Sequence, residues 1–469
     1  MNSPDCINFL TPSGYPPGRE SMRKAPVLIA LILLLTAPTV HAGRLLYYPD
    51  REAFRDFLNS SSSYTVVPGD EDWARGWAYY VDERLATVKP RGRDTIVLVG
   101  NVYDNELMAS LWKRTGLPEN ASLRPSVIVL NNTVLITGSE DNIYLTEEAF
   151  RDLWNPSRMM LITFLLTVLV IALIFSVFLG RDGSHAGKFY LLTLSLYALW
   201  YLLSPRLPLG ETFLRQLLSA LTFAAGGSAE SPLSAIMGAV FRVVPPLEET
   251  LTAAHWVFLL LVISLSFYLA PRKSRELGFL IFGLTFSAPL FREMVSSING
   301  EVLGLTALMV TLAMITNLNF PPGRVFLQTV LLSLFTLLAI AVNPYLVFIP
   351  IVFAVTFPGR HFRNHIYLLM TVGGTLVLYL AFPNLGIMEW TLNTNPGRFI
   401  LDSGLSLGTI VYVLARGGRR VGTRGHTPFL MLSAAIYLPL SLAVSSLIPH
   451  VFVILSALAV RLLSGLART

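Results

Sequence analysis

Long apolar runs separated by short polar segments fill the chain beyond Pro156. Each run is nearly free of charge and close to the roughly 20 residues that cross the hydrocarbon core of a bilayer. Because backbone groups find no water in lipid, such runs must be helices. The pattern therefore predicts a polytopic α-helical membrane domain over 157–469 with about eleven helices, near 158–180, 188–203, 252–270, 276–290, 302–317, 325–342, 345–357, 366–382, 399–415, 427–446 and 449–466.

Residues 43–156 show a different pattern, with short β-branched runs in place of long apolar ones. Asn131-Asn132 lies between two such runs, and asparagine accepts the positive φ that a tight hairpin turn requires. Strands alternating with helices, together with one hairpin, predict a small N-terminal α/β or α+β domain. The expected strands are 64–67, 95–99, 126–130 and 133–137, and the expected helices are 51–58 and 106–114.

The segment before this domain, 1–42, is typical of an upstream stretch followed by a secretory signal peptide. Arg23 and Lys24 form a basic start, an apolar run follows, and small residues lead to an expected cleavage site after Ala42. An uncleaved anchor helix is the alternative, and translation from Met22 rather than Met1 is also open. Cleavage would remove Cys6, the single cysteine, so the domain would be stabilised by its core rather than by disulfides.

Composition supports a membrane protein and excludes a nucleic-acid partner. The chain is 53% hydrophobic and only 14% charged, whereas about a quarter of the residues in a soluble domain are charged. The formal net charge is +6, yet residues 43–156 hold 17 acidic and 12 basic residues, a net −5 by subtraction. The basic excess therefore lies between the apolar runs, where membrane lipids are the natural partner. If cleavage removes Cys6, the absence of cysteine and the scarcity of glutamine also fit a heat-adapted (thermophile) source.

The distribution of basic residues predicts the topology. If residues 43–156 lie outside, the inner loops hold 13 lysines and arginines, and the outer loops after the first span hold 5. Cytoplasmic loops carry such an excess. We therefore expect a multi-pass protein of the cell membrane with its N-terminal domain outside and its C-terminus in the cytoplasm.

Three triplets in the N-terminal domain have the form of glycosylation acceptors, which fits a glycoprotein with this domain outside. They begin at Asn59, Asn120 and Asn131.

One outer loop, 204–250, is much longer than the others. It contains two apolar segments that are too short to cross a bilayer, which predicts two helices lying in the membrane interface. Carboxylates beside apolar surface can act as general bases; the alternative is a loop that plugs the bundle with its carboxylates in water. The acidic residues that bracket the two segments are Glu211, Glu230, Glu248 and Glu249.

The next outer loop also carries ionisable groups at span boundaries, where they are functional candidates. Arg292 and Glu293 are too close in sequence to form a facing helical pair. Either could instead approach Glu211 or Glu248 across the outer mouth. The sequence has no histidine pair with a neighbouring carboxylate, so no motif predicts a metal site. It also has no nucleotide-binding loop and no nucleophile elbow.

A series of short motifs follows in order along 188–466. These are the junction Tyr201–Glu211, Pro245-Pro246-Leu247, Tyr268–Arg272, Ser287-Ala288-Pro289, Asn299-Gly300-Glu301 and Asn343-Pro344-Tyr345. In this order they resemble the GT-C superfamily, polytopic glycosyltransferases that use polyprenyl-phosphate sugars on the outer face. The chain departs from that pattern because Glu211 stands where the family usually has Asp, and Asn343 stands where a basic residue often precedes the proline.

The resemblance implies transfer of a sugar from a lipid-phosphate carrier to an acceptor on the outer face. Glu211 would be the base, with Glu248 and Glu293 as alternatives, and Arg292 and Glu301 would bind substrate. The polyprenyl-phosphate sugar would be the donor, and a divalent metal is left open. The outer domain would hold the acceptor or a cell-surface protein or glycan. A non-catalytic membrane-anchored scaffold and a transporter are the alternatives.

Overall fold

The computed structural model describes residues 45–60, 62–153, 156–182, 184–317, 325–357, 361–382, 396–416 and 426–466. The chain divides into two units, Met1–Thr39 and Val40–Thr469, and all described residues belong to the second. The expected signal segment, with Cys6 and the cleavage site before Gly43, lies outside the described residues.

A five-stranded mixed sheet forms the core of the N-terminal region, in the order β1-β4-β5-β3-β2. Neighbouring pairs are parallel except β4 and β5, which form an antiparallel hairpin. The four expected strands and the hairpin are confirmed. The bounds are β1 Leu46–Tyr48, β2 Tyr64–Pro68, β3 Thr95–Gly100, β4 Ser126–Leu130 and β5 Thr133–Thr137.

The hairpin turn between β4 and β5 contains the backbone conformation expected of its asparagines. Asn131 has a φ of 49°, the left-handed region that asparagine tolerates better than most residues. Strand β1 was not predicted because it has only three residues, too few to show an alternating pattern.

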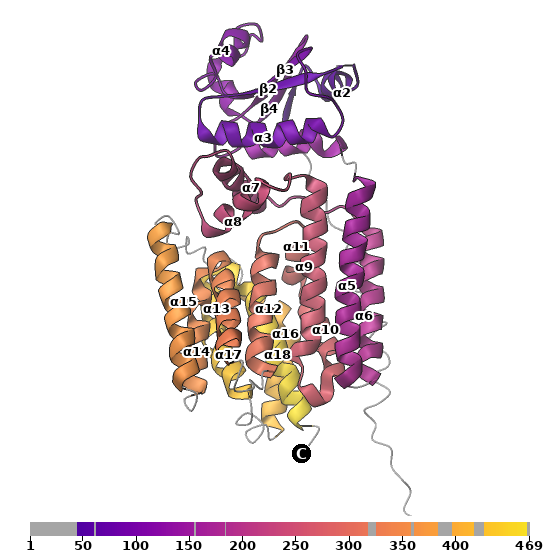
Figure 1. The fold of residues 1–469 in the computed structure, drawn as a ribbon, viewed down its shortest axis with the longest axis vertical. Helices are drawn as coiled ribbons and strands as arrows, with labels where there is room; N and C mark the ends of the chain where they lie inside the picture. Colours follow the sequence, from indigo (N-terminus) through magenta and orange to yellow (C-terminus); the bar gives the residue numbers. More distant parts are fainter. Residues whose placement is uncertain are drawn as a thin grey trace, which may run out of the picture. The chain divides into compact units, whose positions relative to one another are not determined.

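Helices cover both faces of the sheet (Figure 1). On one face, Met108 and Trp112 of α4 (Glu106–Trp112) pack on Leu98, Ile128 and Leu135. On the other lie α2 (Arg51–Ser60), α3 (Asp72–Ala86) and the 3₁₀ segment η2 (Ile143–Leu153), joined through aromatic contacts of Phe150 with Phe54 and Tyr80. A short 3₁₀ turn, η1 (Glu119–Leu123), precedes β4.

Helices make up the rest of the described chain. Six are long and apolar enough to cross a membrane. The bounds are α5 Arg158–Asp182, α6 Ser184–Leu203, α7 Glu211–Ala224, α8 Pro232–Phe241, α9 Glu248–Leu269, η3 Arg272–Leu277, α10 Gly278–Ser287, α11 Pro289–Val295, α12 Glu301–Asn317, α13 Val325–Val342, η5 Pro344–Val347, α14 Phe348–Thr356, α15 His361–Ala381, α16 Pro396–Ala415, α17 Thr427–Ala443, η7 Ser445–Leu447 and α18 Ile448–Leu466.

Each of the eleven predicted runs contains a helix, but several are too short to cross by themselves. The run 276–290 is broken at Ala288, which is extended because a proline follows it and disfavours helical backbone there. The run 345–357 is a 3₁₀ turn followed by the short α14. A membrane protein with six candidate spans is therefore supported, and eleven crossings stay a prediction.

The loop 204–250 contains the two expected helices, α7 and α8. They pack on each other, and α7 packs on α3 of the sheet region (Figure 1). The loop therefore connects the sheet region to the helical region.

Candidate functional site

Two loops that carry candidate residues are joined by backbone hydrogen bonds. The amide of Ile298 donates to the carbonyl of Pro208 at 2.8 Å, and the amide of Gly210 donates to the carbonyl of Ile298 at 3.3 Å. A short parallel bridge between Leu209 and Ile298 results. It brings the start of α7, at Glu211, beside the segment that links α11 to α12. The side chains of Glu211 and Glu293 lie outside what the structure describes.

Arg292 lies on α11, immediately before this segment, and is half-buried. The short helix is attached to α9 through His255, whose Nε2 lies 3.1 Å from the carbonyl oxygen of Val295. Because His255 is buried, this contact fixes the end of α11 against α9. The position of Arg292 is thus set by a neighbouring helix rather than by a free loop.

Glu301 begins α12, just after the same segment, and is half-buried. Its backbone amide donates to Oδ1 of Asn299 at 2.9 Å, which satisfies one of the free amides at the helix start. Gly300 lets α7 come close, since a Cβ there would lie 2.7 Å from Oε1 of Gln216. Glu301 therefore lies near α7, and the loops that carry Glu211, Arg292 and Glu301 converge.

Glu248 and Glu249 belong to a different arrangement, a buried ionic network between the sheet region and α9. Arg84 of α3 donates through Nη1 to Oε2 of Glu249 at 2.8 Å and through Nη2 to Oε2 of Glu248 at 3.4 Å. Arg206 donates two hydrogen bonds to Glu248, from Nε to Oε1 at 2.6 Å and from Nη2 to Oε2 at 2.8 Å. Bidentate pairing of this kind is geometrically specific.

Three of these four charges are almost fully removed from solvent, and Arg206 is partly exposed. The exposed fractions of the side chains are 0% for Arg84, 2% for Glu248 and 3% for Glu249. Breaking a buried ion pair by removing one partner typically costs about 3–5 kcal/mol. Both carboxylate oxygens of Glu248 are thus held by guanidinium groups, and this carboxylate connects the sheet region to α9.

Glu147 of η2 extends the network. Its Oε2 lies 3.6 Å from Nε of Arg151, and its Oε1 has no hydrogen-bond partner among the described residues. Burial raises the pKa of Glu147 from its ordinary 4.5 to about 7, and the charge of Glu248 acts in the same direction, against Arg151, Arg84 and Arg206. The protonation of Glu147 therefore changes near neutral pH.

Small residues allow α3 to contact α7 closely. A Cβ on Gly76 of α3 would lie 2.6 Å from the backbone nitrogen of Thr222 on α7. Beside this contact, the hydroxyl of Tyr79 donates to the carbonyl of Phe241 at 3.1 Å. The sheet region is thus connected to both helices of the loop 204–250.

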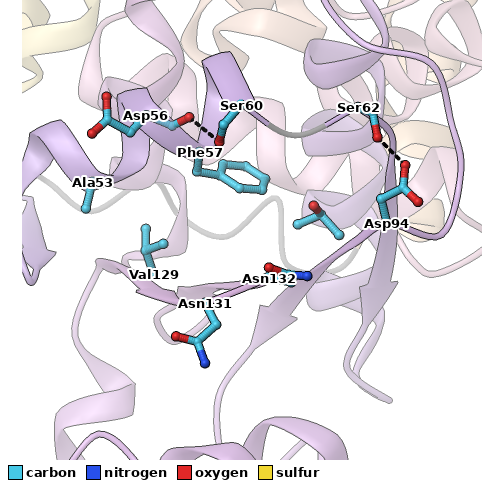
Figure 2. A pocket seen from close by; sticks show the side chains of 10 residues that line it. Ala53, Asp56, Phe57, Ser60, Ser62, Asp94, Val129, Asn131 and Asn132 are labelled. Carbon is cyan, nitrogen blue, oxygen red and sulfur yellow. Dashed lines mark hydrogen bonds between the residues drawn. The ribbon is translucent and has the colours of Figure 1, made fainter.

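Two pockets lie in the sheet region. One, with a volume of about 500 Å³, is at the amino ends of β3 and β5 beside α2 (Figure 2). The other, with a volume of about 300 Å³, follows β2 and α3. Within the described ranges, no group of three or more His, Cys, Asp or Glu side chains has an arrangement that could hold a metal ion.

The three glycosylation candidates, Asn59, Asn120 and Asn131, are all exposed. An acceptor asparagine has to be exposed, so the positions are compatible with modification. Asn131 also lines the larger pocket.

Comparisons with protein-family models, with curated proteins and with solved structures found no match to this chain.

Sequence reasoning missed the role of Arg84, because its partners lie 164 and 165 residues away. A signal was present. Arg84 is on the same side of α3 as Trp77, Tyr80 and Val81, which are all buried. An arginine among buried positions requires a carboxylate, and Glu248-Glu249 was the one adjacent acidic pair noted in the long loop.

Proposed function

We propose that the protein transfers a sugar from a polyprenyl-phosphate carrier to an acceptor hydroxyl on the outer face of the cell membrane. The acceptor oxygen would bond to the anomeric carbon while the bond from that carbon to the carrier phosphate breaks. Glu211 would take the acceptor proton, and the polyprenyl phosphate would leave with the bonding electrons. A positioned base of this type contributes roughly 100- to 10,000-fold in rate.

The observation that carries this proposal is the bridge between Leu209 and Ile298. It brings the loop that carries Glu211 against the loop that carries Arg292 and Glu301. Sugar transfer requires such proximity, because the base and the phosphate-binding group act on the same substrate. Arginine suits the second role because its planar guanidinium pairs with two phosphate oxygens at once. The contact of His255 with Val295 supports a fixed position for Arg292.

The ionic network narrows the choice of base. Glu248 was an alternative to Glu211, but its carboxylate is engaged by Arg206 and Arg84. Glu293, the residue after Arg292 on α11, is then the remaining alternative.

The test compares cells that lack the gene with cells that carry the wild-type protein or Glu211→Gln. We expect a glycan or glycolipid to disappear on deletion and to return with the wild-type protein only. Glu230→Gln is the matched control, because Glu230 is an exposed carboxylate of the same long loop, and it should restore the product. Mass spectrometry of the glycans gives the readout, and the detergent-solubilised variants should keep their melting temperature.

If deletion leaves every glycan unchanged, sugar transfer is wrong. If deletion matters but Glu211→Gln is fully active, the base is another residue, and Glu293→Gln is the next variant.

The second candidate is a membrane-anchored scaffold of the cell surface. The network of Arg84, Arg206, Glu248 and Glu249 favours the scaffold, because these ion pairs fix the sheet region to α9. A scaffold that presents a binding surface needs such a rigid attachment. Deletion would then leave glycans intact but change which proteins are retained at the cell surface.

A further inference from the structure

The larger pocket of the sheet region lies far in the chain from the residues proposed for transfer. It is formed between α2 and the turn that joins β4 to β5, at the amino end of β3, and has a volume of about 500 Å³. Volumes of about 300–1,000 Å³ are typical of sites for small ligands. Figure 2 shows the ring of Phe57 between the α2 residues and Asn132, with Asp94 beyond it.

Polar groups in this pocket are available to a ligand. Among the described residues, the side chains of Asp56, Asn131 and Asn132 make no hydrogen bond and no ion pair. All three are exposed. Each side-chain amide offers two donor hydrogens and an acceptor oxygen, and the carboxylate offers acceptors only.

Asp94 is oriented by two serine hydroxyls. Ser62 donates to its Oδ2 (Figure 2), and Ser63 donates to the same oxygen at 2.7 Å. These hydrogen bonds lower the pKa of Asp94, so it is ionised at neutral pH. Its Oδ1 accepts no hydrogen bond within the described part of the chain and remains open to a ligand.

The charge of the lining decides the class of ligand. Two of the ten lining residues are acidic and none is basic. A phosphate, sulfate or carboxylate ligand would meet like charges and no counter-ion, which is unfavourable. The other polar groups are hydroxyls and amides, which both donate and accept and so match a ligand rich in hydroxyl groups. Phe57, Val129 and Ala53 supply apolar surface for its C–H faces.

We propose that this pocket binds an uncharged saccharide through Asp56, Asp94, Asn131 and Asn132, with Phe57 as its apolar support. The inference does not rest on sugar transfer, because it concerns binding at a separate place in the sheet region. A saccharide site here would let the protein hold a glycan of the cell surface.

A glycan attached to Asn131 is an alternative occupant of the pocket. Asn131 begins an Asn-Asn-Thr triplet and is exposed, so a glycan attached to it would lie at the pocket and exclude a free ligand. The intact mass of the purified protein, before and after glycosidase treatment, must therefore accompany the binding measurement.

The experiment uses the full chain in lauryldimethylamine oxide, because the headgroup of a maltoside detergent is itself a sugar. Saturation-transfer NMR and calorimetric titration are recorded with mannotriose, maltotriose and triacetylchitotriose as neutral probes. Trigalacturonate is the anionic probe, and calcium chloride alone tests for a simple cation site. We expect at least one neutral trisaccharide to bind, and neither trigalacturonate nor calcium to bind.

Asp94→Asn and Asn132→Ala should each weaken that binding about tenfold or more, as expected for the loss of one hydrogen bond in a polar site, more so when it involves a charge. Asp70→Asn is the matched control. Asp70 is an exposed aspartate just beyond the carboxyl end of β2, and the pocket lies at the other end of the strands, at the amino end of β3. This control variant should bind as the wild type does. The proposal is overturned if none of the three neutral probes binds, if trigalacturonate binds equally well, or if calcium binds by itself. It is also overturned if Asn131 carries a glycan, or if both pocket variants bind as the wild type does.

Discussion

Both carboxylate oxygens of Glu248 are held by guanidinium groups, and this changes how its position in the sequence should be interpreted. The acidic pair Glu248-Glu249 was recognisable as unusual at the start of an apolar helix. The pairing of this acidic pair with Arg84 was not predictable, because contact across 164 residues depends on how α3 packs on η2 and α9. Local patterns predict that a buried charge needs a partner, but they do not identify it.

Glu147 provides a test of the network through pH. Its folded-state pKa of about 7 exceeds the ordinary 4.5, so the folded protein holds this proton more tightly than the unfolded chain. The stability that this tightly held proton confers is fully present below pH 4.5, where both states are protonated, and it is lost as the pH rises from 4.5 to 7. Glu147→Gln keeps the shape and removes the titration. We expect its melting temperature to match that of the wild type near pH 4.5 and to exceed it at pH 8.

The difference at pH 8 should be on the order of 3 kcal/mol at most, since each pKa unit corresponds to about 1.4 kcal/mol. Glu148→Gln is the neighbouring control, and it should keep the fall in stability with rising pH that Glu147→Gln removes. A Glu147→Gln variant that is less stable at pH 8 would show that the ionised carboxylate stabilises the network instead.

Among the elements, those of the sheet were the most predictable. β4 and β5 have the predicted bounds, because short runs rich in β-branched residues lie on either side of a turn that asparagine can adopt. Helix α3 was not predicted although it is the longest in the sheet region. Its stripe of Trp73, Trp77, Tyr80 and Val81 is helical in spacing, but Gly76 and the charged end of the helix obscure it.

Gly76 is the position at which the packing of α3 on α7 can be tested. Alanine there would bring a Cβ within 2.6 Å of the backbone of Thr222, so the helices must move apart. Overpacking of this kind costs about 1–3 kcal/mol, more than the roughly 1 kcal/mol that alanine contributes to a helix over glycine. We expect Gly76→Ala to lower the melting temperature.

Gly373→Ala in α15 is the matched control, because no atom of the described residues lies within 4 Å of its added Cβ. That variant should be as stable as the wild type or more stable. If Gly76→Ala behaves like Gly373→Ala, α3 and α7 do not pack as closely as the structure has them.

At the scale of the whole molecule, the sequence predicted a helical membrane protein with a small sheet region before it, because both follow from periodicity and run length. It did not determine how many helices cross, since several apolar runs form only short helices, such as α10 and α14. It also did not predict that the sheet region is fixed to α7, α8 and α9 by Gly76, Tyr79 and Arg84.

Sugar transfer outside the cell requires that the sheet region, and the converging loops of Glu211, Arg292 and Glu301, face the outside. Two exposed lysines give a matched test, Lys113 in the sheet region and Lys273 in the basic segment after α9. In a chain whose Cys6 is replaced by serine, each is changed to cysteine in turn and treated with a membrane-impermeant maleimide. In intact cells we expect labelling of Lys113→Cys and none of Lys273→Cys, with both labelled after permeabilisation. Labelling of Lys273→Cys in intact cells, with Lys113→Cys protected, would contradict the topology and every outer-face assignment that depends on it.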